Sequence, residues 1–161
     1  MSDSSTDPRT DLRTDLRTDP DFFVLLTDSF ARLVGRPLVP AGADAAWLYS
    51  QAPFVCVAHD TQPDPRFVYA NEAAQARFGY GWDEFIGLPS RLSAQAPERA
   101  ERQQFLDTVA AQGYVAGYRG LRVKKSGATF WIEDGLVWQL RDETGALHGT
   151  AAVFSTWTDE G

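Results

Sequence analysis

Residues 118–138, YRGLRVKKSGATFWIEDGLVW, constrain the fold of this chain more than any other stretch. Apolar residues fall at every second position on both sides of Ser126-Gly127, a pattern typical of strands with one buried face. A glycine-containing pair between two such arms predicts a β-hairpin. Together with a further apolar run near the C-terminus, the last third of the chain predicts three consecutive antiparallel strands over 114–124, 129–140 and 147–157.

One face of this hairpin carries two charges at positions where apolar residues are expected. A two-residue turn places Arg119 opposite Asp134, on the same face as Trp138. Two unpaired buried charges would cost too much free energy, so the side chains must be paired or hydrated. The pair is then a structural ion pair, a ligand site in which Arg119 donates hydrogen bonds, or a catalytic site. Catalysis fits least, because arginine stays protonated and lowers the pKa of a neighbouring aspartate.

The opposite face of the hairpin carries Tyr118, Gly120 and Arg122. In the same register Tyr118 lies opposite Gly135, and glycine in a strand leaves room for an aromatic ring to lie flat across the backbone. Arg122 lies opposite Trp131, which predicts a cation–π contact between these two side chains.

The N-terminal third divides into a tail and a helical region. Residues 1–18 repeat Thr-Asp-Leu-Arg with little to bury, so we predict a disordered tail. Helices are expected over 19–52, and Asp19-Pro20 and Gly35 mark the start and end of the first helix. Its apolar stripe must cover the chain's own sheet or another subunit. The stripe residues are therefore candidates for an interface between copies: Phe22, Leu26, Phe30 and Leu33.

The middle of the chain alternates short strands and helices. The runs FVCVAH and RFVYAN predict two strands, and EAAQARFG predicts a helix capped by Asn71. A helical turn near Asp83 and a long helix ending at Gly113 follow. Strands joined by hairpins, with helices grouped between them, predict an α+β domain over 53–158. We expect a five-stranded antiparallel sheet with helices packed on one face.

Composition excludes several classes of protein. The net charge of −7 argues against nucleic acid as a partner. One cysteine rules out a disulfide framework within the chain, and no local spacing of ligands suggests a metal site. No apolar run is long enough to span a bilayer, and the first residues do not form a signal peptide. The cytoplasm is the expected compartment.

Residues in the middle and at the end of the chain resemble known sequences. FVYANEAAQARFGYGWDEFIGLPSRLSAQ resembles the PAS core, in which a strand ends at Asn and a short helix follows. LPSRLSA, together with GYRGLRVKKSGATFWIEDGLVW, is similar to the narrower MEKHLA domain family in its stand-alone bacterial type. The resemblance extends over about residues 21–157. It implies a sensory or protein-interaction module with no assigned reaction.

The resemblance also places a pocket between the sheet and the helices. The pocket candidates are Asn71, Tyr69, Arg91, Arg119, Asp134 and Trp138. Flavin photochemistry in related light sensors needs a cysteine in the helical middle of the domain, whereas Cys56 lies on the first strand. We therefore expect no flavin–thiol adduct, and no cofactor is assigned. Non-covalent binding of a flavin or of another small organic ligand is the remaining alternative. His59 is interpreted as a solvated loop residue.

We therefore expect a module without catalytic residues that binds a small ligand or a partner protein. It would form a homodimer through the first helix, and any signal would pass to a separate protein. The alternative is a cone-shaped enzyme similar to the NTF2-like isomerases and cyclases, with an unpaired Asp134 as acid or base in an apolar pocket. A contact between Asp134 and Arg119 would favour the first hypothesis.

Overall fold

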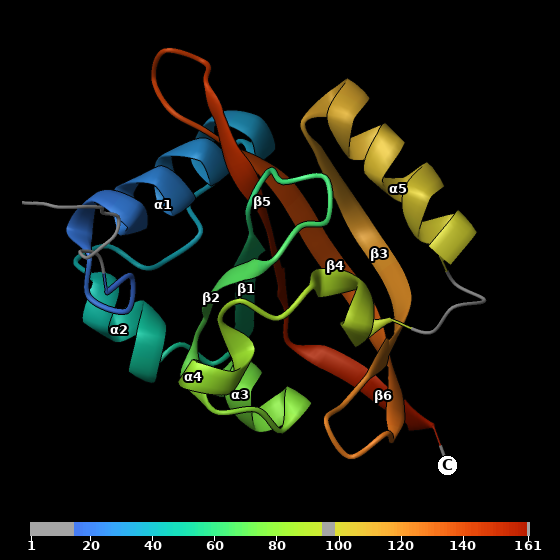
Figure 1. Cartoon of the computed structure of the whole chain (residues 1–161). Coiled ribbons are helices and arrows are strands. Elements are labelled where there is room, and N and C mark those ends of the chain that lie inside the picture. The colour runs from blue at the N-terminus through green and yellow to red at the C-terminus, as the bar shows by residue number, and fades with distance from the viewer. Residues whose placement is uncertain (1–14, 95–98, 161) are drawn as a thin grey trace, which may run out of the picture.

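The computed structural model describes residues 15–94 and 99–160. Figure 1 shows an antiparallel sheet with helices on both of its faces. The elements in chain order are α1 (Pro20–Val34), α2 (Ala45–Ser50), β1 (Val55–His59), β2 (Phe67–Ala70), α3 (Glu72–Phe78), α4 (Trp82–Phe85), the short helix η1 (Ser90–Ser93), α5 (Arg99–Gln112), β3 (Tyr114–Val123), β4 (Thr129–Arg141), β5 (Leu147–Phe154) and β6 (Thr156–Glu160). The strand order β2-β1-β5-β4-β3, with β6 beside β4, confirms the predicted α+β architecture.

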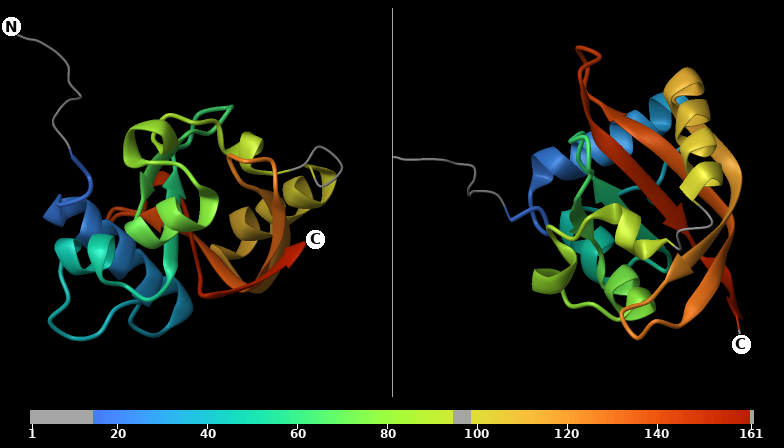
Figure 2. Two further views of the ribbon diagram at one scale, coloured as in Figure 1. Left: turned by 90° about the horizontal axis from the view of Figure 1, so that it is seen from below. Right: turned by 45° about the vertical axis from the view of Figure 1, so that its right-hand side comes forward.

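Helix α1 begins and ends where its capping residues predict. The Asp19 side chain accepts a hydrogen bond from the Asp21 amide, and Gly35 ends the helix in the left-handed conformation. The helix lies across one face of the sheet (blue in Figures 1 and 2), which we call the outer face. Phe30 packs edge-on against Trp138 of β4, with ring centroids 4.9 Å apart.

This packing corrects the predicted interface between copies. Phe22, Leu26 and Phe30 are buried against the chain's own sheet, and Leu33 is half-buried beside Gly113. The apolar stripe of α1 therefore covers the chain's own sheet and not another subunit. Burying these side chains stabilises the fold by roughly 1.5–3 kcal/mol each. A dimer could not use them unless α1 left the sheet.

Helices α3, α4, η1 and α5 occupy the opposite, inner face of the sheet. Phe78 of α3 packs against both Phe130 of β4 and Phe85 of α4, with ring centroids 5.3 and 5.5 Å apart. α5 lies along β3 (Figure 1), and its Phe105 stacks on Tyr118. The sheet thus separates two apolar layers, one beneath α1 and α2 and one beneath α3 and α4.

The last predicted strand is in fact two strands. The chain bends at Ser155, so that β5 pairs with Leu136–Arg141 of β4 and β6 pairs with Thr129–Glu133. The pairs Leu136 with Val153 and Glu133 with Thr156 keep the same register on both sides of the bend. Ser155 therefore falls opposite Asp134, and neither residue takes part in the ladder.

The predicted hairpin register is wrong by one residue near the turn. The Lys124 amide bonds to the Ala128 carbonyl at 2.9 Å, which leaves a three-residue loop that ends at Gly127 with φ 92°. Glycine in the left-handed region is what such a loop requires. As a result Leu121 pairs with Trp131, where the two-residue turn had placed Arg122.

A bulge at Asp134 reverses the faces of β4. Asp134 has φ 51°, the one positive value among the described non-glycine residues. Before it, Phe130 and Ile132 face the inner layer; after it, Leu136 and Trp138 face α1. An inserted strand residue shifts the alternation by one position, so uniform alternation through 129–140 cannot hold.

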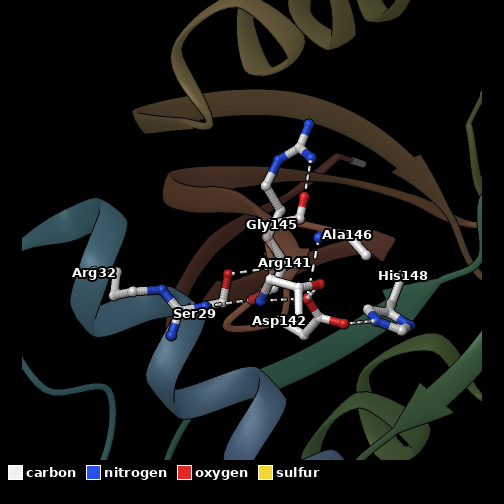
Figure 3. A network of polar contacts seen from close by, with 8 residues as sticks. Ser29, Arg32, Arg141, Asp142, Gly145, Ala146 and His148 are labelled. Carbon is white, nitrogen blue, oxygen red and sulfur yellow. Dashed lines mark hydrogen bonds and ion pairs between the residues drawn. The ribbon is translucent and has the colours of Figure 1, made fainter.

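A polar network joins α1 to the hairpin between β4 and β5 (Figure 3). The buried Ser29 hydroxyl donates to the Gln139 carbonyl at 2.6 Å and accepts from the Arg141 amide at 3.1 Å. Arg32 donates to the Arg141 carbonyl. Beyond the strand, the Asp142 carboxylate contacts His148 Nε2 at 2.8 Å. These bonds fix the position of α1 along the outer face.

The segment just before α1 contacts the rest of the fold. Most of the predicted tail, residues 1–14, lies outside the described residues. Within the remainder, residues 15–18 form a turn, and the Arg17 guanidinium lies 5.0 Å from the ring centre of Trp82. Contacts with the rest of the fold therefore begin before residue 19.

Candidate functional site

A cavity of about 60 Å³ lies between the inner face of the sheet and the helices that cover it. Its wall is largely apolar, with a few polar groups, which is the usual composition of a ligand site. The volume is sufficient for a few water molecules or a very small organic molecule. The main contributors are Val57, His59, Phe105, Tyr118, Arg122 and Ile132.

Arg122 is the cationic group of this wall. Its Nη2 atom donates to the Tyr118 hydroxyl at 2.7 Å, and Nη1 donates to the Leu121 carbonyl at 3.1 Å. It forms no ion pair with a carboxylate of the described residues. Arginine carries five N–H donors, so the half-buried guanidinium keeps donors for a further acceptor.

Tyr118 is held in place from both sides. Phe105 of α5 stacks on its ring with centroids 4.2 Å apart. On the other side the phenol lies across Gly120, where an added Cβ would be 2.0 Å from the hydroxyl oxygen. The predicted pairing of Tyr118 with Gly135 across the hairpin is confirmed, but the ring lies over Gly120 of its own strand. Because Tyr118 receives the Arg122 hydrogen bond, Gly120 also sets the position of the guanidinium.

The remaining polar groups of the wall come from β1, η1 and β5. His59 is half-buried and its Nδ1 contacts the Asp60 carbonyl at 3.0 Å, so the interpretation as a solvated loop residue is wrong. The Ser93 hydroxyl donates to the Ser90 carbonyl at 2.7 Å. Thr150 of β5 completes the polar part of the wall.

Asn71 joins three elements and is buried. Its Oδ1 accepts from the amides of Ala74 and Cys56, both at 3.0 Å, which confirms the predicted cap of α3. Its Nδ2 donates to the carbonyls of Leu48 and Phe54 at 3.1 and 3.0 Å. All four hydrogen-bonding positions of the amide are used. Asn71 therefore has no group left for a ligand.

Two other pocket candidates lie beneath α1, outside the cavity. Tyr69 and Trp138 are buried on the outer face. Burial raises the pKa of the Tyr69 hydroxyl well above its usual range. Trp138 lies on the outer face and not in the cavity because the bulge at Asp134 reverses the two faces of β4. Arg91 lies at the surface and bonds Asp64 at 3.2 Å.

Arg119 and Asp134 are not partners, and both are exposed at the surface. Arg119 Nε donates to Glu133 Oε1 at 2.8 Å, and its guanidinium lies 4.0 Å from the ring centre of Trp131. The Thr158 hydroxyl and Arg119 lower the pKa of Glu133. The predicted cation–π contact between Arg122 and Trp131 is therefore wrong, because Arg122 lies near the ring of Tyr118. Asp134 does not line this cavity.

The flavin–thiol arrangement does not fit this chain. Cys56 is buried beneath α1 among Tyr69 and Trp138, on the face opposite the cavity. Burial raises the pKa of its thiol to about 12, which keeps it protonated. A ligand in the cavity would be separated from this sulfur by the sheet. Within 15–94 and 99–160, no group of three or more potential metal ligands occurs. None of the described helices is long and apolar enough to cross a membrane.

Comparisons with solved structures define the class as a PAS fold. The chain is similar to a PAS domain of Colwellia psychrerythraea with TM-score 0.60 and 19% identity, over 71% of this chain and 92% of that one. It is similar to a light-oxygen-voltage domain studied with a flavin analogue (TM-score 0.53, 24% identity, 66% and 77% covered). An RNA-binding light-oxygen-voltage receptor matches with TM-score 0.59 and 21% identity, over 77% of this chain and 36% of that one.

The family follows from the sequence itself. The model of the MEKHLA domain matches residues 21–159, which extend from the first turn of α1 into β6. The chain belongs to the MEKHLA domain family and has a PAS-like fold, so the alternative of an NTF2-like enzyme is not supported.

Proposed function

We propose that this domain senses a small carboxylate, of the size of acetate or pyruvate, in the cavity beneath α5. The observation that carries the proposal is the Arg122 guanidinium, held in the apolar wall by Tyr118 and without a described carboxylate partner. Arginine pairs with carboxylates through two parallel hydrogen bonds, which makes it a specific receptor for them. The cavity of about 60 Å³ limits the ligand to a few heavy atoms.

Binding would act on α5 and η1. Phe105 contacts Tyr118, so a ligand that shifts Arg122 and Tyr118 also changes the packing of α5. A ligand can shift such an equilibrium only by the difference between its affinities for the two arrangements. We propose that a partner protein or a second copy of the chain responds to this change, and that the domain itself catalyses no reaction.

A homodimer and a cytoplasmic location complete the proposal. The inward face of α1 is already used, so a dimer would use the outward face, where Val24 is half exposed. A single buried cysteine suits a reducing compartment. The net charge of −7 supports a small ligand or protein over nucleic acid as the partner.

A thermal-shift comparison of charged and neutral analogues tests the ligand class. We expect acetate and pyruvate to raise the midpoint of unfolding, whereas acetamide and pyruvamide, which match them in size, leave it unchanged. Equal shifts for acids and amides would contradict recognition by Arg122. Native mass spectrometry of the same sample reports the oligomeric state and any ligand that co-purifies.

A further inference from the structure

A second hollow lies on the outer face of the sheet, beside the C-terminal end of α1. It has a volume of about 290 Å³, near the lower end of the range for small-molecule sites. Its lining includes the apolar side chains of Phe30, Leu38, Phe54, Leu136 and Val153. Asp134 and Arg36 also line it, and we call it the Asp134 groove.

The groove lies where three neighbouring strands are irregular. On β3, Ala116 and Gly117 have no partner in the ladder, and Gly117 has φ 68°. On β4 the irregular residue is Asp134 at φ 51°, and opposite it the chain bends at Ser155. Interrupted ladders leave backbone N–H and C=O groups available for other partners. All four of these residues line the groove.

The backbone conformation of Asp134 is costly for an L-residue, and it turns an acidic side chain into the groove wall. Aspartate tolerates the left-handed region better than most residues, but glycine would adopt it without strain. A strained residue that persists in a structure is an observation from which a functional hypothesis can start. The retained carboxylate is the feature that glycine could not supply.

The opposite charges of Asp134 and Arg36 therefore lie beside these apolar side chains and form no ion pair with each other. Arg36 lies over the Phe30 ring, 5.6 Å from its centre. Neither Asp134 nor Arg36 forms an ion pair with any side chain in the described part of the chain. A ligand that carries an ammonium group, a carboxylate and an apolar group complements all three parts of the groove.

We propose that the Asp134 groove binds a free apolar α-amino acid as its zwitterion. The ammonium group donates hydrogen bonds to Asp134, the carboxylate accepts them from Arg36, and the side chain lies on Phe30 and Leu136. Charge-assisted hydrogen bonds of this kind are the strong ones in protein recognition. This site is separate from the cavity around Arg122, which lies on the other face of the sheet.

Calorimetric titration with L-leucine and with 4-methylpentanoate, the same molecule without its amino group, tests the proposal. We expect the wild-type chain to bind leucine about tenfold more tightly than the acid, because only leucine reaches Asp134. Asp134→Asn keeps a residue that tolerates the left-handed conformation, so it should fold normally and bind both ligands equally. Arg36→Gln should instead abolish the preference for leucine over its decarboxylated amine, 3-methylbutylamine.

The controls separate this site from the cavity. Glu143→Gln removes an exposed carboxylate from the β4–β5 turn and should leave leucine binding unchanged. Arg122→Gln should also leave it unchanged, even if it abolishes carboxylate binding in the cavity. The absence of saturable leucine binding to the wild type would overturn the proposal, as would an unchanged ratio of the two affinities in Asp134→Asn. A groove that takes only a peptide or a protein would give the first of these results.

Discussion

The guanidinium of Arg122 donates a hydrogen bond to the hydroxyl of Tyr118, 2.7 Å away and four positions earlier on the same strand. Both side chains project from the inner face of β3, with Gly120 between them. The phenol lies across the glycine and holds the arginine toward the cavity. The recognition element that we propose is therefore one short run of a single strand, braced by Phe105 of α5.

Gly120→Ala should disrupt this arrangement. An added Cβ would lie 2.0 Å from the Tyr118 hydroxyl and 2.4 Å from the ring carbon that bears it, so the ring must move and Arg122 loses its partner. We expect a loss of about 1–3 kcal/mol in the free energy of unfolding, as for other overpacked sites. Pyruvate affinity, measured by calorimetry, should fall about tenfold or more. Gly81→Ala is the control for pyruvate binding, because its Cβ would meet only ordinary contacts. Unchanged pyruvate affinity in Gly120→Ala would contradict the positioning role of Tyr118.

The sequence predicted the elements of this fold well where the signal is local. Helix caps at Asp19 and Asn71 and the terminating Gly35 and Gly113 are chemical signals that do not depend on distant contacts. The order of strands and helices followed from these boundaries.

The predicted pair of Arg119 and Asp134 failed because two irregularities have no clear local signal. The turn takes three residues, which shifts the register by one, and the bulge at Asp134 then reverses the inward and outward positions of β4. No local pattern indicates that the aspartate at this position lies in the left-handed region. Arg122 was not among the predicted pocket residues, although its alternation with Tyr118 and Gly120 on one face was visible and could have indicated it.

Asp134 allows a direct test of the bulge. Asp134→Gly should raise the free energy of unfolding by up to about 1 kcal/mol, because glycine adopts φ 51° without strain. Asp134→Val should lower it by about 2 kcal/mol, because a β-branched residue is a genuine outlier there. Urea unfolding followed by circular dichroism gives both values. If valine were tolerated as well as glycine, the backbone at this position would have to be regular.

Arg77 should anchor strand β6 to the domain. Its guanidinium lies 4.7 Å from the ring centre of Phe130 and 4.6 Å from that of Trp157, and it bonds Asp159 at 3.0 Å. We expect Arg77→Lys to cost about 1 kcal/mol, because an ammonium group cannot stack between two rings as a planar guanidinium does. Amide hydrogen exchange should accelerate in β6 more than in β5.

The matched control for this change is Arg91→Lys. Arg91 pairs with Asp64 at the surface, where an ion pair contributes little to stability. The control should therefore unfold at the wild-type urea concentration. Equal exchange rates for β6 in the wild type and Arg77→Lys would show that the strand is held by its pairing with β4 alone.

The carboxylate of Asp142 in the β4–β5 turn should make the stability of the fold depend on pH. His148 and then the Thr144 hydroxyl, with further bonds from the Ala146 and Thr144 amides, hold the pKa of Asp142 well below its usual range. The folded-state pKa is thus lower than the unfolded value of about 3.9, so the contribution to stability is present above about pH 4 and is lost as the pH falls further. Asp142→Asn removes this contribution.

We expect the difference in unfolding free energy between wild type and Asp142→Asn to shrink between about pH 5 and pH 2. Thermal unfolding at matched pH values measures it. Asp83→Asn, at an exposed carboxylate on α4, should show a smaller change over the same range. A difference for Asp142→Asn that stays constant or grows toward low pH would contradict the lowered pKa.

The most direct test of the proposed sensory site is calorimetric titration of pyruvate into the wild type and two Arg122 variants. We predict saturable binding to the wild type, a loss of about tenfold to a hundredfold in Arg122→Gln, and partial retention in Arg122→Lys, which keeps the charge but not the planar donor pair. Arg91→Gln, which removes an exposed arginine outside the cavity wall, should bind as the wild type does. Binding that is equal in the wild type and Arg122→Gln, or absent from the wild type, would contradict carboxylate recognition in the cavity.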